Sequence, residues 1–247
     1  MRRNIIKTRH GEMSFLEGEG EIPVILLHGL GGMGNVFFKL SNCLSGRYKF
    51  IFPDLLGHGH TVADDDNITV RMQCESVEDL INGLNLKKPI IGGHSYGGWI
   101  ALNYATMHDD ISALLLISNA GTNPTLSDRG NAAIEKFLDQ VVEVNRKNDR
   151  NTMKKIIINN SRDEMRVPES SIRNLRVPTL IVWGSEDHMI PLEYGINLSK
   201  LIPGSRLHII EGGGHKAHYS HYEEVCKAIG EFLSTLNSFE PKTTDPK

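Results

Sequence analysis

The chain has 247 residues, of which 23% are charged, and its formal net charge is −3 at pH 7. This length suits one large α/β domain with a substantial core. The charge balance gives no support to nucleic acid or an anionic membrane surface as a main partner. No apolar run approaches the ~18 residues of a membrane span, and the basic N-terminus lacks the apolar segment of a signal peptide. We therefore expect a cytoplasmic protein.

Three cysteines, Cys43, Cys74 and Cys226, are scattered along the chain. Their odd number and the lack of a C-x-x-C pair argue against a disulfide framework or a zinc site. Unpaired cysteines are typical of a reducing compartment. We expect neither a metal nor a cofactor, and the sequence leaves a homodimer open.

Strand-like apolar runs alternate with helix-like segments, which predicts an α/β fold with a mainly parallel sheet and helices on both faces. Strands are expected at 13–17, 23–28, 48–53, 89–93, 111–119, 178–184 and 206–211. Helices are expected at 36–44, 70–84, 95–107, 192–201 and 222–236. Four of the strands are continuously apolar. That composition is typical of strands buried on both faces.

The segment between residues 121 and 176 interrupts this alternation. Its apolar residues follow helical spacing, at Ile134, Phe137, Leu138, Val141 and Val142, and a shorter helix is expected at 152–160. The segment carries 11 Lys/Arg and 8 Asp/Glu, a net charge of +3. An insertion at the C-terminal ends of parallel strands is the usual position of a lid over a binding crevice. We therefore expect a helical cap at 121–176, with a purely structural helical excursion as the alternative.

Residues 1–120 and 177–237 are expected to form one core that carries this insertion. No internal repeat and no low-complexity linker divides them. The last ten residues, 238–247, are polar and include two prolines. We expect them to form a disordered tail.

A glycine-flanked serine follows the fourth expected strand. Gly93-His94-Ser95-Tyr96-Gly97 fits G-x-S-x-G, in which the serine occupies a sharp strand-to-helix turn with its hydroxyl exposed. The glycines are needed because the turn is too tight for a Cβ two residues before or after the serine. A serine hydroxyl becomes a nucleophile when a base accepts its proton and a third group orients that base. The sequence must therefore supply a histidine and a carboxylate.

Both groups occur in loops after later strands. Asp187 follows a buried apolar strand, and the adjacent Glu186 is an alternative carboxylate. Three glycines precede His215 and give its loop the freedom to reach across the strand ends. His218 and His221 lie close in the sequence, so position alone does not select the base.

A glycine-rich loop follows an early strand and is a candidate oxyanion-binding loop. Its sequence is His28-Gly29-Leu30-Gly31-Gly32-Met33-Gly34. Acyl transfer needs backbone N–H groups directed at the charge that forms on the attacked carbonyl oxygen. One donor is expected at Tyr96, directly after the serine, and the second at Leu30. The loop lacks the G-x-x-x-x-G-K-[ST] pattern of a phosphate-binding loop. Asp54, the nearest strand-end acid, fits a tight turn better than a ribose contact.

The chain resembles the α/β-hydrolase fold superfamily from about residue 13 to residue 232. The glycine loop, Ser95, Asp187 and His215 occur in the chain order of that fold. His28-Gly29 resembles its oxyanion motif, and residues 54–61 resemble its D-x-x-G-x-G-x-S loop. The resemblance implies Ser95 as nucleophile, Asp187 as acid and His215 as base. It also implies that the insertion at 121–176 is the cap, which is short for the family.

A serine nucleophile resembles the carboxylesterases, lactonases, thioesterases, carbon–carbon bond hydrolases and cofactor-free perhydrolases of this superfamily. We expect a carboxylesterase that cleaves small-molecule esters of small to medium acyl chains through an acyl-enzyme on Ser95. The runner-up is a carbon–carbon bond hydrolase of vinylogous keto acids, although Lys216 stands where that group often has tryptophan. A non-catalytic ligand sensor or scaffold is a third alternative, which the complete set of candidate residues disfavours.

Overall fold

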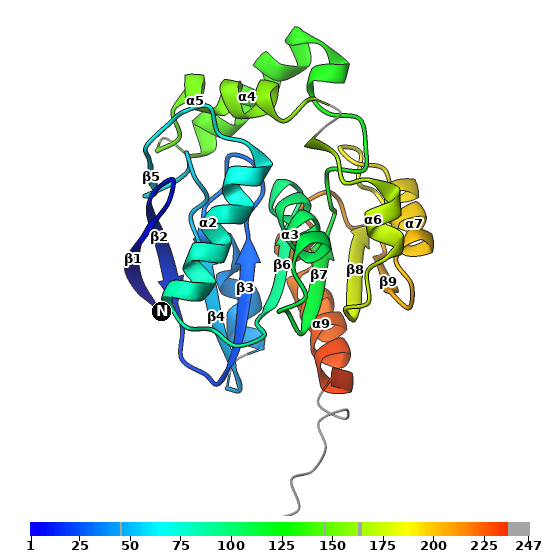
Figure 1. Ribbon diagram of the computed structural model, residues 1–247. Helices are drawn as coiled ribbons and strands as arrows, with labels where there is room; N and C mark the ends of the chain where they lie inside the picture. Colours follow the sequence, from blue (N-terminus) through cyan, green and yellow to red (C-terminus); the bar gives the residue numbers. More distant parts are fainter. Residues whose placement is uncertain (45, 146, 163–164, 237–247) are drawn as a thin grey trace, which may run out of the picture.

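The computed structural model of the protein describes residues 1–44, 46–145, 147–162 and 165–236. In this part of the chain nine strands form one sheet, in the order β1-β2-β4-β3-β6-β7-β8-β9, with β5 paired to β2 (Figure 1). The strands are β1 (Arg2–Thr8), β2 (Gly11–Glu17), β3 (Ile22–Leu27), β4 (Tyr48–Pro53), β5 (Val62–Ala63), β6 (Ile90–His94), β7 (Ala113–Ile117), β8 (Thr179–Gly184) and β9 (Arg206–Ile210). The tail expected at 238–247 lies outside the described residues.

The sheet is parallel from β4 to β9 and antiparallel at its other edge. Pairs β4-β3, β3-β6, β6-β7, β7-β8 and β8-β9 are parallel. Strand β2 pairs antiparallel with β1, β4 and β5. The α/β fold class predicted from the sequence is confirmed.

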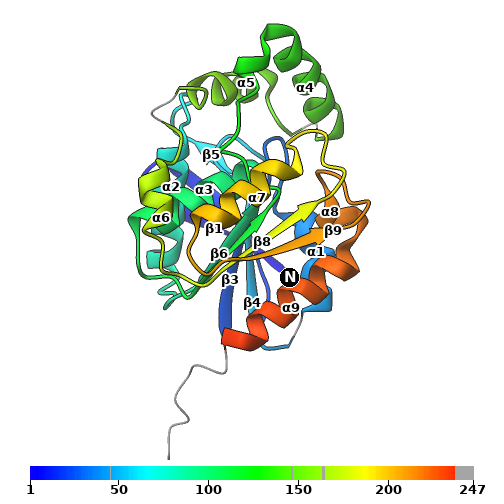
Figure 2. The ribbon, with the colours of Figure 1, turned by 90° about the vertical axis from the view of Figure 1, so that its right-hand side faces the viewer.

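Helices cover both faces of the sheet (Figures 1 and 2). They are α1 (Phe38–Cys43), α2 (Val70–Gly83), α3 (Tyr96–Met107), α4 (Asn131–Val144), α5 (Arg150–Asn159), α6 (Glu169–Arg173), α7 (Leu192–Leu201), α8 (Ala217–Ser220) and α9 (Tyr222–Leu236), with short 3-10 helices η1 (Gly34–Phe37) and η2 (Ser127–Arg129). Helices α2 and α3 pack together on one face, and α1 and α9 pack together on the other. The five helices expected in the core are therefore present.

Alternate residues of the central strands supply two separate apolar clusters. On β3, Ile25 and Leu27 pack with the residues of α2 and α3, whereas Val24 and Leu26 pack with those of α1 and α9. Successive side chains of a strand point to opposite faces. The continuously apolar strands are thus buried on both sides, as their composition predicts.

Strands β1 and β5 were not expected from the sequence. Strand β1 pairs with β2 along its whole length, from Arg2 opposite Glu17 to Thr8 opposite Gly11. Its sequence RRNIIKT has no clear alternation of polar and apolar residues. The strand is specified by the tight turn that folds it back on β2 and not by a pattern of its own.

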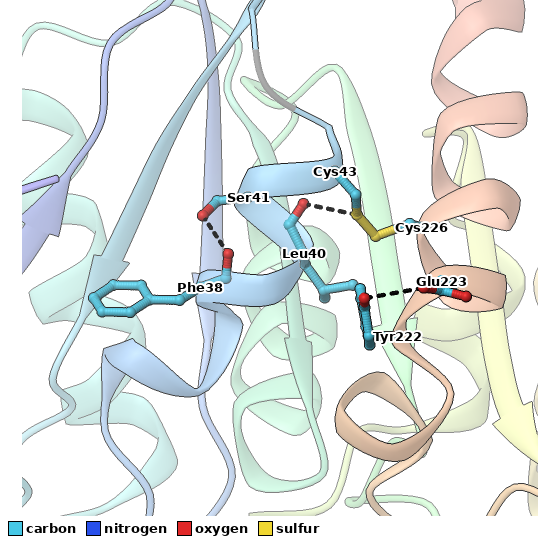
Figure 3. The surroundings of a disulfide bond; sticks show 7 residues. All are labelled: Phe38, Leu40, Ser41, Cys43, Tyr222, Glu223 and Cys226. Carbon is cyan, nitrogen blue, oxygen red and sulfur yellow. Dashed lines mark hydrogen bonds between the residues drawn. A yellow bond between two sulfur atoms is a disulfide. The ribbon is translucent and has the colours of Figure 1, made fainter.

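A disulfide bond joins Cys43, at the end of α1, to Cys226 in α9 (Figure 3). Their Cα atoms lie 6.3 Å apart, although 183 residues separate them in the sequence. The expectation of unpaired cysteines is wrong for these two, while Cys74 is free and buried. The pair forms because α1 and α9 lie against the same face of the sheet, which cysteine spacing does not reveal. The cysteines therefore no longer argue for a reducing compartment.

Helices α4 and α5 of the insertion lie beyond the C-terminal ends of the parallel strands (Figures 1 and 2). Asp149 caps the N-terminus of α5, where its side chain accepts the N–H of Thr152. The third helix, α6, was not expected, and it packs beside α7 along the core. In the described ranges, no helix is both long and apolar enough to cross a membrane.

Candidate active site

Ser95 occupies the turn between β6 and α3. Its φ of 52° and ψ of −113° are rare for a residue with a side chain and cost of order 1–3 kcal/mol. The turn is held against the end of β7: the Ser95 N–H donates to the Ile117 carbonyl at 3.0 Å, and the Ser95 carbonyl accepts the Ala120 N–H at 3.1 Å. The surrounding hydrogen bonds therefore maintain a strained backbone at the serine.

The glycines on either side of Ser95 are required by space. A Cβ on Gly93 would overlap the backbone of Gly97, and a Cβ on Gly97 would overlap the carbonyl group of Leu27. The prediction that this turn excludes a side chain at both positions is confirmed. Ser95 consequently sits at the C-terminal edge of the sheet and lines a pocket there.

Asp187 and His215, from the loops after β8 and β9, are in direct contact. His215 Nδ1 lies 2.8 Å from Asp187 Oδ2, and Asp187 Oδ1 accepts the N–H groups of Met189 at 3.0 Å and Ile190 at 2.8 Å. Burial opposes ionisation of Asp187, but the hydrogen bond and charge of His215 and the Ile190 N–H lower its pKa overall. An ionised Asp187 holds the proton of His215 on Nδ1 and leaves Nε2 free to accept another.

The alternatives that the sequence leaves open lie elsewhere. Glu186 is exposed. The ring of His218 packs against His94 and Phe37, with centroids 4.2 Å and 5.5 Å away. His221 Nδ1 lies 2.9 Å from the hydroxyl of Ser220. The geometry therefore favours the pair Asp187 and His215.

Ser95 is linked to this pair through its neighbour His94 and is not hydrogen-bonded to it. The ring centroid of the preceding residue, His94, is 4.7 Å from that of His215. Among the described residues, the Ser95 hydroxyl forms no hydrogen bond with His215. Such contacts are often long without substrate and shorten in the substrate complex. The structure thus brings the three expected side chains to one edge of the sheet.

The two residues expected to supply N–H donors line the same pocket. Leu30 and Tyr96 line it together with Ser95. Tyr96 is the first residue of α3, where a backbone N–H has no partner within the helix. Within the described ranges, neither N–H donates to another protein group. Both remain available for an oxygen of a bound molecule.

Asp54, His28 and Asn148 hold the glycine loop, residues 29–34, through hydrogen bonds of 2.6–2.8 Å, and Asn145 adds a longer one of 3.5 Å to the Gly32 carbonyl. Asp54 accepts the Gly34 N–H at 2.8 Å and the His60 N–H at 3.1 Å, which supports the structural role expected for this acid. His28 Nδ1 donates to the Gly29 carbonyl at 2.8 Å, while its Nε2 accepts the Leu55 N–H at 3.0 Å. Burial lowers the pKa of His28, which suits this neutral form.

The third side chain, Asn148, comes from the loop between α4 and α5. Its Nδ2 donates to the Gly31 carbonyl at 2.6 Å, and its Oδ1 accepts the Gly59 N–H at 3.3 Å. The side chain is buried. Sequence reasoning missed it because one asparagine in a polar loop has no distinguishing pattern.

A pocket of about 100 Å³ opens beside Ser95. One water needs only about 10–15 Å³, so the pocket admits a short chain of heavy atoms. Its lining from the insertion is mainly apolar and includes Pro124, Leu126, Phe137, Ile156 and Ile157. Arg129 also lines it and donates to the Met189 carbonyl at 2.8 Å. In the part of the chain that the structure describes, no three His, Cys, Asp or Glu side chains are grouped as metal ligands.

Comparisons with known proteins agree with this architecture. Lipase 1 of Psychrobacter immobilis is 26% identical over 87% of this chain and 78% of its own length. The 2-hydroxy-6-oxo-6-(2'-aminophenyl)hexa-2,4-dienoic acid hydrolase of Metapseudomonas resinovorans is 29% identical over 90% of this chain and 88% of its own. The solved structure of a thermophilic esterase from Thermogutta terrifontis has a TM-score of 0.78 at 21% identity, covering 96% of this chain and 99% of that one. Because residues 22–155 and 161–222 match the family model for the alpha/beta hydrolase fold, the chain belongs to that family.

Proposed function

We propose that the protein is a serine hydrolase that cleaves carboxylic esters of small to medium acyl chains. The observation that carries this proposal is the Asp187–His215 hydrogen bond of 2.8 Å at the sheet edge that also holds Ser95. An oriented imidazole beside a serine on a strained turn is the arrangement that activates a hydroxyl for attack on a carbonyl. The similarity to a lipase and an esterase supports the same reaction class.

In the proposed reaction, Ser95 Oγ attacks the ester carbonyl while His215 Nε2 accepts the hydroxyl proton. The N–H groups of Leu30 and Tyr96 stabilise the negative charge on the carbonyl oxygen. The C–O bond to the alcohol then breaks, and His215 gives its proton to the leaving oxygen. Water, deprotonated by the same histidine, attacks the acyl-enzyme and releases the carboxylic acid and Ser95.

The insertion at 121–176 acts as the cap in this proposal. Phe137, Ile156 and Ile157 face the pocket beside Ser95, so an acyl chain would contact an apolar surface there. The pocket volume of about 100 Å³ favours short chains over long ones. We therefore expect turnover to decline once the acyl chain exceeds this space.

A carbon–carbon bond hydrolase is the second candidate, and Arg129 is the observation that favours it. This cation lines the mainly apolar pocket, where a guanidinium is suited to pair with a substrate carboxylate. One relative is named as a dienoic acid hydrolase. An Arg129→Gln variant with raised KM for a vinylogous keto acid would support this candidate, whereas unchanged KM would oppose it.

The decisive experiment is a screen of p-nitrophenyl esters of rising acyl length, with lactones, thioesters and a vinylogous keto acid. We expect the highest kcat/KM on short esters. Ser95→Ala should lose about 10³-fold or more of kcat while it keeps the wild-type melting temperature. Near-wild-type ester turnover by this variant would refute the assignment, and release of one equivalent of product without turnover would favour a ligand sensor.

A further inference from the structure

We infer that His94, the residue before the serine, is a positioning residue that fixes the backbone of the His215 loop relative to Ser95. The inference rests on the proposed function, because it assigns His215 as the base. It concerns a side chain for which the proposed reaction gives no role.

His94 contacts the histidine loop through both a hydrogen bond and its ring. Its Nε2 lies 2.7 Å from the main-chain carbonyl oxygen of His215. Its ring centroid lies 4.7 Å from the His215 ring and 4.2 Å from the His218 ring. The residue is 6% exposed, so solvent does not compete for this hydrogen bond.

The tautomer of His94 follows from its partner. A carbonyl oxygen only accepts, so Nε2 must carry the proton. Burial, reinforced by the nearby His218 and His215, lowers the pKa of His94 well below its ordinary value. The ring is therefore neutral and has one N–H, which is used on the His215 carbonyl.

The other ring nitrogen lies against the glycine loop. A Cβ on Gly29 would come within 2.8 Å of His94 Nδ1 and 3.3 Å of its Cε1. Glycine at position 29 therefore leaves the space that the ring occupies. Gly29 also precedes Leu30, one of the two expected N–H donors.

One rigid ring thus connects three parts of the site. It is one peptide bond from Ser95, it rests on Gly29, and it holds the carbonyl of His215. Asp187 orients the His215 side chain, but nothing in that contact places the loop backbone relative to the serine. A displacement of about 1 Å in a reacting group can cost about 100-fold in rate.

The test compares His94→Leu, which removes the donor, with His94→Gln, whose amide N–H can reach the same carbonyl. We expect His94→Leu to lower kcat on a short p-nitrophenyl ester by about 10- to 100-fold with KM changed less than about threefold. His94→Gln should restore most of that loss. Wild-type kcat in the leucine variant, or equal losses in both variants, would overturn the inference.

His218→Leu is the matched control. His218 is a buried histidine of the same cluster, and its Nδ1 has no hydrogen-bond partner among the described residues. Its removal takes away ring packing without removing a hydrogen bond to the loop. We expect a lower melting temperature with kcat within about threefold of wild type. Matching kcat losses in His218→Leu and His94→Leu would point to packing and overturn the inference.

Proton NMR supplies a readout that needs no turnover. The His215 Nδ1–H bound to Asp187 should give a downfield resonance that shifts or broadens in His94→Leu and returns in His94→Gln. Gly29→Ala, which keeps the donor but displaces the ring, should shift it as well, so the test does not depend on His94→Leu folding. An unchanged resonance in both variants would overturn the inference. Wild-type protein without ester turnover would instead refute the proposed function.

Discussion

The sheet core is buried on both faces, whereas the insertion at 121–176 combines an apolar side that packs on the core with exposed ion pairs between its helices. The central strands are buried on both faces, and Ile25 and Trp183 are fully buried within them. Exposed ion pairs join α4 and α5, including Arg150 to Glu135 at 2.6 Å and Lys154 to Glu135 at 2.7 Å. Salt does not screen apolar burial, whereas exposed ion pairs contribute little and are screened.

The two regions also contribute different groups to the pocket. The core supplies Leu30, Ser95 and Tyr96, and the insertion supplies Phe137 and Ile156. Groups that take part in the proposed chemistry thus stand on rigid strand ends, while groups that would contact the substrate stand on the helices above. We infer that substitutions in the core change kcat and that those in the insertion change selectivity.

The largest effect is expected in the core, at Asp187. Asp187→Asn keeps an oxygen for the N–H groups of Met189 and Ile190 but presents an amide N–H to His215, which favours the wrong tautomer. We expect kcat on a short ester to fall by about 10³- to 10⁴-fold with the melting temperature little changed. The exposed neighbour Glu186→Gln serves as control and should retain activity. A fall of less than tenfold in Asp187→Asn would show that this contact is structural.

Asn148 tests the connection between the regions. Asn148→Ala leaves the buried Gly31 carbonyl and Gly59 N–H without a partner, which costs about 1–3 kcal/mol. Because Gly31 follows Leu30, we expect kcat/KM to fall by about tenfold together with the free energy of unfolding measured in urea. Asn151→Ala, an exposed asparagine on α5, should change neither quantity. Normal kcat/KM in Asn148→Ala would mean that the glycine loop needs no support from Asn148.

Phe137 tests the selectivity of the insertion. Phe137→Ala enlarges the pocket, so we expect the ratio of kcat/KM for an octanoyl ester to that for an acetyl ester to rise by about tenfold. Phe38→Ala changes an exposed phenylalanine on α1 and should leave this ratio unchanged. Equal ratios in both variants would contradict a role of Phe137 in acyl-chain selection.

The smallest effect is expected for the exposed ion pairs. Arg150→Gln removes contacts to Glu135 and Asp139, and we expect no measurable change in melting temperature because both partners stay solvated. The core counterpart is Arg3, which binds the fully buried carboxylate of Asp54 at 2.8 Å. Arg3→Ala should destabilise the fold by about 1–2 kcal/mol. A larger loss of stability in Arg150→Gln than in Arg3→Ala would reverse the comparison.

Sequence patterns predicted the core better than the insertion, and the reason is physical. A strand buried on both faces must be apolar throughout, so β3, β6, β7 and β8 were recognisable without neighbours. Strand β1 is specified by its pairing with β2, and α6 has only five residues, too few for a periodic pattern. Local patterns thus indicate elements that bury much apolar surface and miss those specified by a neighbour.

The candidate site divides in the same way. The motif around Ser95 is local, because Gly93 and Gly97 are needed by a turn within five residues. The residue types alone do not distinguish Asp187 from Glu186, because both are carboxylates in the same loop. The tertiary structure distinguishes them by showing which side chain reaches His215. The contacts of His94 and Asn148 join segments far apart in the sequence, as does the Cys43–Cys226 bond.

The sequence alone therefore predicted the strands of the described sheet other than β1 and β5, the chain order of the motifs and the tight turn at Ser95. These depend on apolar burial and steric space within short segments, both of which residue identity reveals. Beyond what the family resemblance implied, tertiary structure showed which histidine contacts Asp187, which side chains hold the glycine loop and which helices line the pocket. Those contacts depend on how distant segments pack, because a hydrogen bond needs its two partners within about 3 Å.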